Sequence, residues 1–148
     1  MTRYRLARAE DIPAVVTLER EIFSLPWSGA GFRAELDSPD AAFYLALEDE
    51  VLAGFAVIHF FPDEAEVFNV AVNPGFRRRG IARHLMELCL EEAGRRGTKR
   101  VLLEVRQSNA AARALYSGLG FQVLGLRRGY YEEPREDAIM MEFCPDRI

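Results

Sequence analysis

A tight group of arginines around a glycine lies near the middle of the chain. The stretch NPGFRRRGIARHL, residues 73–85, holds four arginines and two glycines, although the whole chain carries a net charge of −4. It follows the β-branched run FNVAV and precedes a segment whose apolar residues have helical spacing. The first turn of a helix leaves backbone N–H groups without partners, and together with the helix dipole these groups attract anions.

This order of strand, basic turn and helix predicts a cradle for a diphosphate group. Gly80 has no side chain, so a phosphate can approach the backbone there, and arginine supplies charge and a planar fork suited to phosphate oxygens. The pattern is neither the G-x-x-x-x-G-K-[ST] loop nor the G-x-G-x-x-G fingerprint of dinucleotide-binding folds. The alternative is a basic turn that is simply solvated.

A single carboxylate interrupts an apolar strand further along the chain. Glu104 is the one acidic residue in VLLEV, residues 101–105. Burying a charge among apolar residues is costly unless the charge is paired or has a function. Glu104 is therefore either a functional carboxylate or half of a structural salt bridge, for which Arg106 and Arg135 are the candidate partners.

Periodicity and turn residues indicate the elements that must position these residues. The expected strands are residues 4–8, 42–48, 51–61, 64–72, 100–105, 121–126 and 137–143, and the expected helices are residues 9–23, 28–36, 81–96 and 108–120. Pro13 fits the first turn of the first helix, Ser28 caps the second, and a loop from Arg127 to Glu136 separates the last two strands. The layout predicts a mixed α/β fold with helices covering one central sheet.

Composition excludes several classes of protein. The 148 residues, 49% of them apolar, predict one soluble domain over residues 1–148. No apolar run approaches the ~20 residues that cross a bilayer, and the N-terminus lacks a signal-peptide core, so we expect a cytoplasmic protein. Cys89 and Cys144 are expected to be small core residues, and His59 and His84 form no metal-ligand cluster. The mild negative charge argues against broad nucleic-acid binding.

Several motifs occur in an order that resembles a known family. Arg77-x-x-Gly80-x-Ala82 fits the [RQ]-x-x-G-x-[GA] pattern of the GNAT acetyltransferases. Around it lie PWS (26–28), FNVAVNP (68–74), RRRGIARHL (77–85), LEVRQSNAAARALYSGLGF (103–121), RRGYY (127–131) and REDAIMM (135–141). Together they resemble the bacterial RimI-type ribosomal-protein alanine N-acetyltransferases. That family commonly has Asn before the paired tyrosines, where this chain has Gly129.

The resemblance implies a fold and an activity. The fold is a central, mostly antiparallel mixed sheet of about seven strands with about four helices, with strands that splay at the acetyl-CoA site. The activity is transfer of an acetyl group from acetyl-CoA to the N-terminal α-amine of a protein, with the N-terminal alanine of a small-subunit ribosomal protein as the expected acceptor and no metal. We expect a monomer or weak dimer without membrane or nucleic-acid partners.

The resemblance also implies roles for individual residues. Glu104 is the implied proton acceptor, and Tyr116, about two turns after Asn109 on one helix face, is the implied proton donor to the leaving thiolate. The implied acetyl-CoA site comprises Val70, Ala71, Val72, Arg77, Arg78, Arg79, Gly80, Ile81, Ala82, Arg83 and Asn109, and the expected acceptor groove comprises Trp27, Tyr130 and Tyr131. The alternatives are a core tyrosine at Tyr116 and a packing anchor at Trp27.

Two rival functions remain open at the level of sequence. Acidic residues beside Tyr131 are compatible with a small-molecule amine as acceptor, such as a polyamine, an aminoglycoside or an amino acid; they are Glu132, Glu133, Glu136 and Asp137. The other rival is a non-catalytic acyl-CoA-binding module, which would bind CoA without turnover.

Overall fold

A seven-stranded mixed sheet forms the centre of the protein. The computed structural model describes residues 1–145, and its strands lie in the order β1-β2-β3-β4-β5-β7-β6. The strands are β1 (Thr2–Leu6), β2 (Ala41–Glu48), β3 (Val51–Phe60), β4 (Glu64–Val72), β5 (Arg100–Arg106), β6 (Gln122–Tyr131) and β7 (Glu136–Phe143). All neighbours are antiparallel except β4 and β5, which are parallel. The expected mixed, mostly antiparallel sheet is confirmed.

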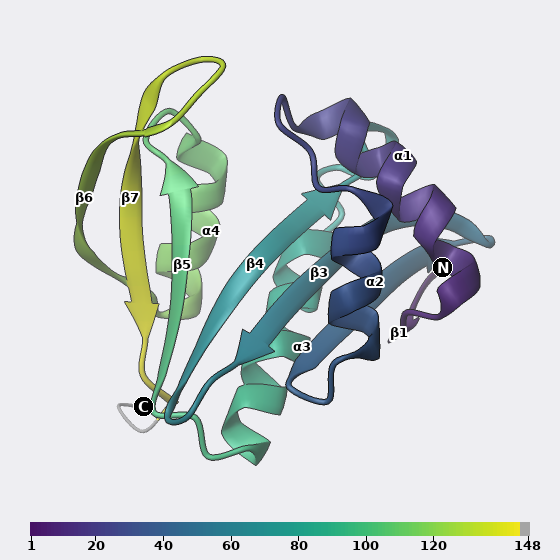
Figure 1. Ribbon diagram of the computed structural model, residues 1–148, viewed down its shortest axis with the longest axis horizontal. Helices are drawn as coiled ribbons and strands as arrows, with labels where there is room; N and C mark the ends of the chain where they lie inside the picture. Colours follow the sequence, from purple (N-terminus) through teal and green to yellow (C-terminus); the bar gives the residue numbers. More distant parts are fainter. Residues whose placement is uncertain (146–148) are drawn as a thin grey trace.

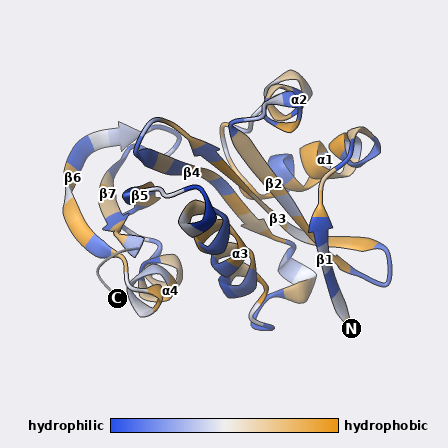
Figure 2. Cartoon of the chain, turned by 90° about the horizontal axis from the view of Figure 1, so that it is seen from below, coloured by the Kyte–Doolittle hydropathy of each residue, from blue (hydrophilic) through white to orange (hydrophobic). Residues whose placement is uncertain are grey.

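Helices cover both faces of this sheet (Figures 1 and 2). The helices are α1 (Ile12–Ile22), α2 (Gly29–Asp37), α3 (Ile81–Arg95) and α4 (Ala110–Leu119), with short 3₁₀ helices at Ala9–Asp11 and Pro74–Phe76. One face buries an apolar cluster under α1 and α2 that includes Phe32 and Phe55, and the other buries a cluster under α3 and α4 that includes Leu85 and Tyr116. Each fully buried large apolar side chain contributes about 1.5–3 kcal/mol, which fixes both helix pairs on the sheet.

Local sequence signals set the helix ends beside the site. The Ser28 hydroxyl accepts the backbone N–H of Gly31 at 3.1 Å, as expected for the cap of α2. Asn109 caps α4 in the same way, because its side-chain oxygen accepts the N–H of Ala112 at 3.1 Å. Gly120 ends α4 with a φ of 107°, a conformation that favours glycine. The residues that flank α4, Asn109 and Gly120, therefore determine where this helix begins and ends.

The strands β4 and β5 are paired over only part of their length. Their register joins Glu64 to Arg100, Ala65 to Val101 and Glu66 to Leu102, and no further β4–β5 pair occurs among the described residues. Beyond this point the two strands diverge, and the divergence is visible between the teal and green strands of Figure 1. The backbone of residues 67–72 of β4 is therefore an open edge that faces the gap between β4 and β5. This edge leads into residues 77–80, the arginine-rich turn.

The expected loop from Arg127 to Glu136 is wrong. β6 continues to Tyr131 and β7 begins at Glu136, so only residues 132–135 connect them. The ladder continues past a register shift between Arg127 and Tyr131, where Gly129 adopts a φ of 60°. Turn-forming residues and charge had indicated a loop, but the residues pair with the neighbouring strand β7. The first strand is also displaced, because it spans residues 2–6 instead of 4–8.

Candidate active site

The arginine-rich turn connects the open edge of β4 to α3, as the sequence predicts. Arg78 and Gly80 adopt φ values of 66° and 76°, and Gly80 is the residue immediately before the helix. A Cβ atom at Gly80 would meet nothing within 4 Å, so the backbone conformation, not crowding, calls for glycine. Arg77, Arg78 and Arg79 are all exposed. The free N–H groups of the first turn of α3 and three solvated guanidinium groups therefore lie together, which suits a diphosphate.

The last turn of α4 lies beside the first turn of α3. A Cβ atom on Gly118 would lie 3.7 Å from Nη1 of Arg83, which also forms a 3.8 Å ion pair with Glu87. Asn109 is exposed at the first residue before α4, and its side-chain oxygen is engaged in capping the helix. Its amide N–H₂ remains the group with which it can contact a ligand. Val70 and Val72 pack from β4 toward the same helices, whereas Ala71 points to the α1–α2 cluster.

Glu104 lies on β5 next to the divergence from β4. Its side chain is 18% exposed, its Oε1 lies 3.9 Å from Nη1 of Arg127, and the Tyr130 hydroxyl forms a hydrogen bond with it. That hydrogen bond is the main cause that raises the pKa of Tyr130 to about 12. The partners expected from sequence, Arg106 and Arg135, are wrong. Glu104 is instead contacted by two residues of β6, a strand that sequence analysis ended before Arg127.

Arg106 is engaged elsewhere, in holding the β6–β7 connection. Its guanidinium donates to the backbone carbonyls of Pro134 and Glu132 at 2.9 and 3.0 Å and lies 3.4 Å from a carboxylate oxygen of Glu136. It also lies over the Tyr131 ring, 4.5 Å from the centroid. Burial is the main cause that raises the pKa of Tyr131 to about 12. Arg106 thus fixes the β6–β7 connection that directly follows the paired tyrosines.

Tyr116 lies in the core between α4 and the sheet. It is 9% exposed, its ring packs 5.9 Å from that of Phe121, and burial raises its pKa to about 12. The buried Cys89 nearby is a second, smaller cause that raises the pKa of Tyr116. The residue therefore combines the packing of a core tyrosine with a hydroxyl that stays protonated at neutral pH.

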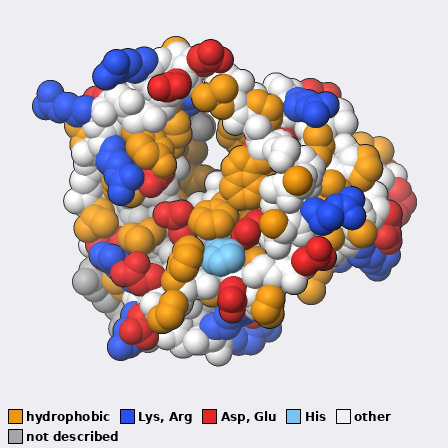
Figure 3. Space-filling view, in the orientation of Figure 1, with side chains coloured by type: hydrophobic (Ala, Val, Ile, Leu, Met, Phe, Trp, Pro, Cys, Tyr) orange, Lys and Arg blue, Asp and Glu red, His pale blue; other side chains and the backbone are white. Residues whose placement is uncertain are grey.

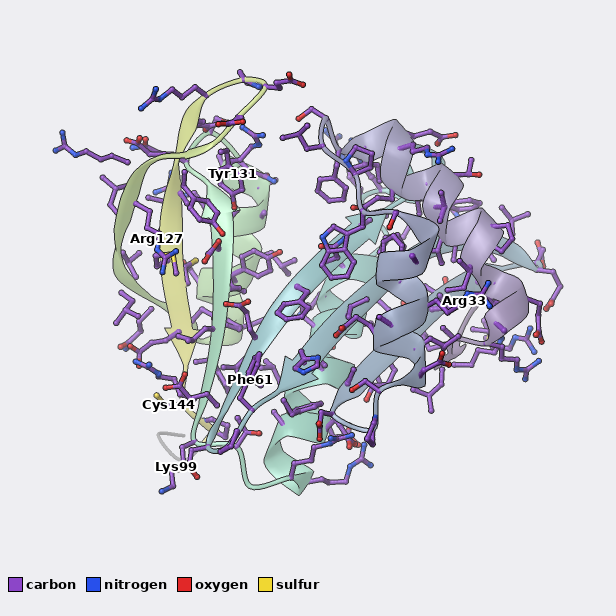
Figure 4. The ribbon with its side chains drawn as sticks, viewed as in Figure 1. Arg33, Phe61, Lys99, Arg127, Tyr131 and Cys144 are labelled. Atoms are coloured by element: carbon purple, nitrogen blue, oxygen red, sulfur yellow. The ribbon has the colours of Figure 1, made fainter. Side chains whose placement is uncertain are left out.

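A hollow separates the two sides of the molecule in the space-filling view (Figure 3). Figure 4 shows Arg127 and Tyr131 on the β6–β7 side, and Phe61 near the end where β4 and β5 are paired. On the opposite side the Trp27 ring lies 5.1 Å from Phe32 and 5.8 Å from Phe68. The expected groove residues thus lie on two different elements, with Trp27 on the α1–α2 loop and the two tyrosines on β6.

Residues 12–121 match the model of the acetyltransferase (GNAT) family. The chain belongs to this family. It is 41% identical over 133 residues to the [ribosomal protein bS18]-alanine N-acetyltransferase of Escherichia coli K12, covering 88% of this chain and 89% of that protein. It is 41% identical over 142 residues to the N-alpha-acetyltransferase RimI of Mycobacterium tuberculosis, covering 92% and 87%. The crystal structure of the ribosomal-protein-S18-alanine N-acetyltransferase from Escherichia coli superposes with a TM-score of 0.89 at 36% identity, covering 97% and 94% of the two chains.

The expected GNAT fold is therefore confirmed, including the order of elements and the splayed strands. The departure at Gly129 also has a physical explanation. Its φ of 60° lies in the left-handed region, which glycine and asparagine both adopt, and its N–H donates to Asp137 at 2.7 Å. A Cβ atom there would lie 2.8 Å from Nε of Arg135, so the absence of a side chain at Gly129 leaves room for that arginine.

Two carboxylates next to His59, those of Glu66 and Glu35, were not singled out from the sequence. Glu66 on β4 pairs with His59 on β3, and burial, followed by the charge of Glu104, raises the pKa of its carboxyl. His59 contacts Glu35 at 2.7 Å and stacks on Phe68 with centroids 5.3 Å apart. The alternation in EAEVF could have drawn attention to Glu66. Glu66 pairs with Leu102, whose side chain lies on the same face of β5 as that of Glu104.

The described part of the chain holds neither a metal-ligand cluster nor a membrane-spanning helix. Within residues 1–145 no three His, Cys, Asp or Glu side chains are grouped as metal ligands, and none of the helices there is long and apolar enough to cross a membrane. Cys89 is a free thiol. Cys89 is buried in the core as expected, whereas Cys144 is only half-buried and contacts Glu142.

Proposed function

We propose that this chain transfers the acetyl group of acetyl-CoA to the N-terminal α-amine of a protein, with the N-terminal alanine of a small-subunit ribosomal protein as its acceptor. The observation that carries the proposal is the divergence of β4 from β5, which opens the sheet between the arginine-rich turn and Glu104. Membership of the GNAT family and 41% identity to a bS18-alanine N-acetyltransferase support both the reaction and the acceptor.

The residues around the opening fit acetyl-CoA. Arg77, Arg78, Arg79 and Arg83 with the N–H groups of Gly80, Ile81 and Ala82 would hold the diphosphate, because anions bind at helix N-termini and to arginine forks. The open edge of β4 at Val70, Ala71 and Val72 would hydrogen-bond the amide groups of the pantetheine arm, and the Asn109 amide would contact the same arm. No residue in this set calls for a metal.

The chemistry needs one proton removed and one supplied. Acetyl-CoA supplies an acetyl thioester, which an amine lone pair attacks so that a C–N bond forms and the C–S bond breaks. Glu104 accepts the proton that the amine loses, directly or through a water molecule. Tyr116 donates its hydroxyl proton to the departing sulfur, a role that fits a phenol whose pKa is about 12. An α-amine has a pKa near 8, so a single carboxylate suffices at neutral pH.

The acceptor would enter between the α1–α2 loop and the β6–β7 hairpin. Trp27 provides an apolar wall on one side, and Tyr130 and Tyr131 provide rings and hydroxyls on the other. These are the features expected of a groove that takes an extended peptide end. The proposed setting of this reaction is the cytoplasm, where ribosomal proteins are made.

A polyamine acceptor has less support. Of the four acidic residues beside Tyr131, Glu136 binds Arg106 and the N–H of Ser108, and Asp137 binds the N–H of Gly129. These two carboxylates therefore satisfy the protein's own donors.

The deciding experiment compares three acceptors with purified protein and acetyl-CoA. A peptide with a free N-terminal alanine should be acetylated faster than the same peptide N-blocked and carrying lysine, and faster than spermine, because the lysine amine has a pKa more than two units higher. Mass spectrometry of the products locates the acetyl group. A blocked, lysine-bearing peptide that reacts best would overturn the N-terminal assignment, and CoA binding without any product would favour a binding module.

A further inference from the structure

A buried carboxylate lies behind the α1–α2 loop, away from Glu104. Glu19 on α1 is 2% exposed, the lowest exposure of any acidic residue in the core. Its Oε2 accepts the backbone N–H of Trp27 at 3.0 Å, and its two oxygens accept the Asn69 side-chain N–H₂ at 2.9 and 3.0 Å. No ion pair of Glu19 with a lysine or arginine occurs among residues 1–145, so its partners are two neutral amides.

Such a carboxylate is costly to bury and would be replaced without loss by an apolar residue if it served packing alone. Burial is the main cause that raises the pKa of Glu19, and the hydrogen bonds from Trp27 and Asn69 act against that cause. Its position on the apolar face of α1, beside Val15 and Leu18, is one that helical periodicity assigns to a hydrophobic residue. The carboxylate of Glu19 is therefore explained by its hydrogen bonds to the Trp27 N–H and the Asn69 side chain, and not by packing.

Those two groups belong to two different elements that lie side by side, the α1–α2 loop and β4. Trp27 lies on the loop between α1 and α2, immediately before the Ser28 cap. Asn69 lies on β4 next to the register shift at which β4 bulges against β3, within the open edge of residues 67–72. The Trp27 ring meets the Phe68 ring edge-on, so the loop also contacts β4 directly at the residue before Asn69.

We propose that Glu19 is a positioning residue that fixes the α1–α2 loop against β4 and so sets the shape of the acceptor side of the groove. This inference rests on the proposed function for its kinetic consequences, but the structural link itself does not. Glu19 touches neither the arginine-rich turn nor Glu104. Its loss should therefore affect acceptor binding and leave acetyl-CoA binding in place.

Three substitutions test the link kinetically. Glu19→Ala leaves the Trp27 N–H and the Asn69 amide without their acceptor, so the acceptor KM should rise about tenfold, while the acetyl-CoA KM stays within about twofold. Glu19→Gln should restore most of the acceptor KM, because the Gln oxygen can accept from Trp27 and a turned Asn69 amide can accept from the Gln N–H₂. Asn69→Ala should have an effect that is not additive with Glu19→Ala, because both remove the same hydrogen bonds.

Asp11→Asn is the matched control. Asp11 is a carboxylate at the opposite end of α1 that binds Arg5 and the N–H of Arg8, so its loss weakens the same helix without touching the loop. It should lower Tm without a selective change in the acceptor KM. If Glu19→Ala changes both KM values together, or lowers Tm alone as Asp11→Asn does, Glu19 is a packing residue and the proposal is wrong.

A second readout does not depend on the acceptor. Trp27 is the single tryptophan of the chain, so its intrinsic fluorescence reports on this loop alone. In Glu19→Ala its emission should shift to longer wavelength and become more accessible to acrylamide, while Glu19→Gln and Asp11→Asn should resemble the wild type. Unchanged emission in Glu19→Ala would overturn the link. Failure of the wild type to acetylate any peptide would instead count against the proposed function and leave the fluorescence test intact.

Discussion

The hydroxyl of Tyr130 on β6 forms a hydrogen bond with the carboxylate of Glu104 on β5. The two strands are not neighbours, because β7 lies between them, and Met140 of β7 pairs with Glu104 on one side and with Gly125 on the other. Tyr130 is 45% exposed, so one side chain reaches both the base proposed for the reaction and the solvent-filled side of the hollow. The acceptor groove and the proposed base are thus physically connected.

Replacing Glu104 by Gln should reduce kcat and move the pH–rate profile toward higher pH. The substitution is nearly isosteric and removes the proton acceptor, so the reaction then depends on amine that has lost its proton without help, above about pH 8. The acetyl-CoA KM should not change, because the arginine-rich turn is elsewhere. Steady-state kinetics with an Ala-initiated peptide between about pH 6 and 10 provides the measurement, and an unshifted profile would contradict the role of Glu104.

Replacing Tyr130 by Phe should have a smaller effect than Glu104→Gln. The change keeps the ring and removes the hydrogen bond that orients the carboxylate. A hydrogen bond to a charged group contributes about 1.5–3 kcal/mol, so kcat should fall about tenfold or somewhat more. Tyr131→Phe is the matched control, since its ring lies under Arg106 and its hydroxyl has no comparable bond to Glu104. Equal losses in both variants would show that the bond to Glu104 is not the cause.

Replacing Tyr116 by Phe should lower kcat by about 10²-fold while the protein stays folded, because the ring keeps its packing and only the proton donor is lost. The pKa of about 12 adds a pH prediction for the wild type. A phenol with this pKa remains protonated while the acceptor amine loses its proton, so the rate should rise to a plateau near pH 8–9 and not fall again there. Wild-type turnover in Tyr116→Phe would leave Tyr116 as a core residue only.

Replacing Arg78 and Arg79 together by Ala should raise the KM for acetyl-CoA and weaken its dependence on salt. Both side chains are exposed beside the start of α3, and exposed charges act on a diphosphate through interactions that salt screens. The acceptor KM should stay constant, which separates this variant from Glu19→Ala. A KM for acetyl-CoA that is unchanged at all salt concentrations would mean that the turn is merely solvated.

The Arg5–Asp11 pair predicts a pH dependence of stability. The hydrogen bonds from Arg5, at 2.7 and 2.9 Å, are the main cause that lowers the pKa of Asp11 below its usual 3.8. A lowered folded-state pKa stabilises the fold above the unfolded pKa, and the contribution is lost as pH falls through the folded value. Asp11→Asn should therefore lower Tm at pH 7, with a difference from the wild type that shrinks below about pH 4. Parallel Tm curves across this range would contradict the assignment.

Sequence alone predicted the elements that lead to the arginine-rich turn, because each has a local signal. β4 has the expected bounds, and the change from period two to helical spacing after Pro74 marks α3 correctly. The partners of Glu104 could not be predicted in this way. They depend on β6 pairing with β7 through Arg127, a long-range register that turn-forming residues around Gly129 concealed.

The same limit applies to Glu19. Its helical position was recognised, but its hydrogen bonds join residues 8 and 50 positions away along the chain. The direction of its contacts follows from how α1 packs over β4, which no local pattern specifies. A carboxylate on an apolar helix face was nevertheless a signal that a buried partner had to exist.

The partial pairing of β4 with β5 also divides the hydrogen-bond network of the sheet. β2 and β3 are paired along almost their whole length, whereas within residues 1–145 the strand pairing between the β1–β4 half and the β5–β7 half is limited to Glu64–Glu66 of β4. Amide protons in this seam should exchange with solvent at a lower free energy of opening than those within either half, so the two halves should behave as separate cooperative units. A ligand that binds the open edge at Val70 and Val72 and also contacts the β5–β7 half would couple these units. Its binding should slow amide-proton exchange on both sides of the seam.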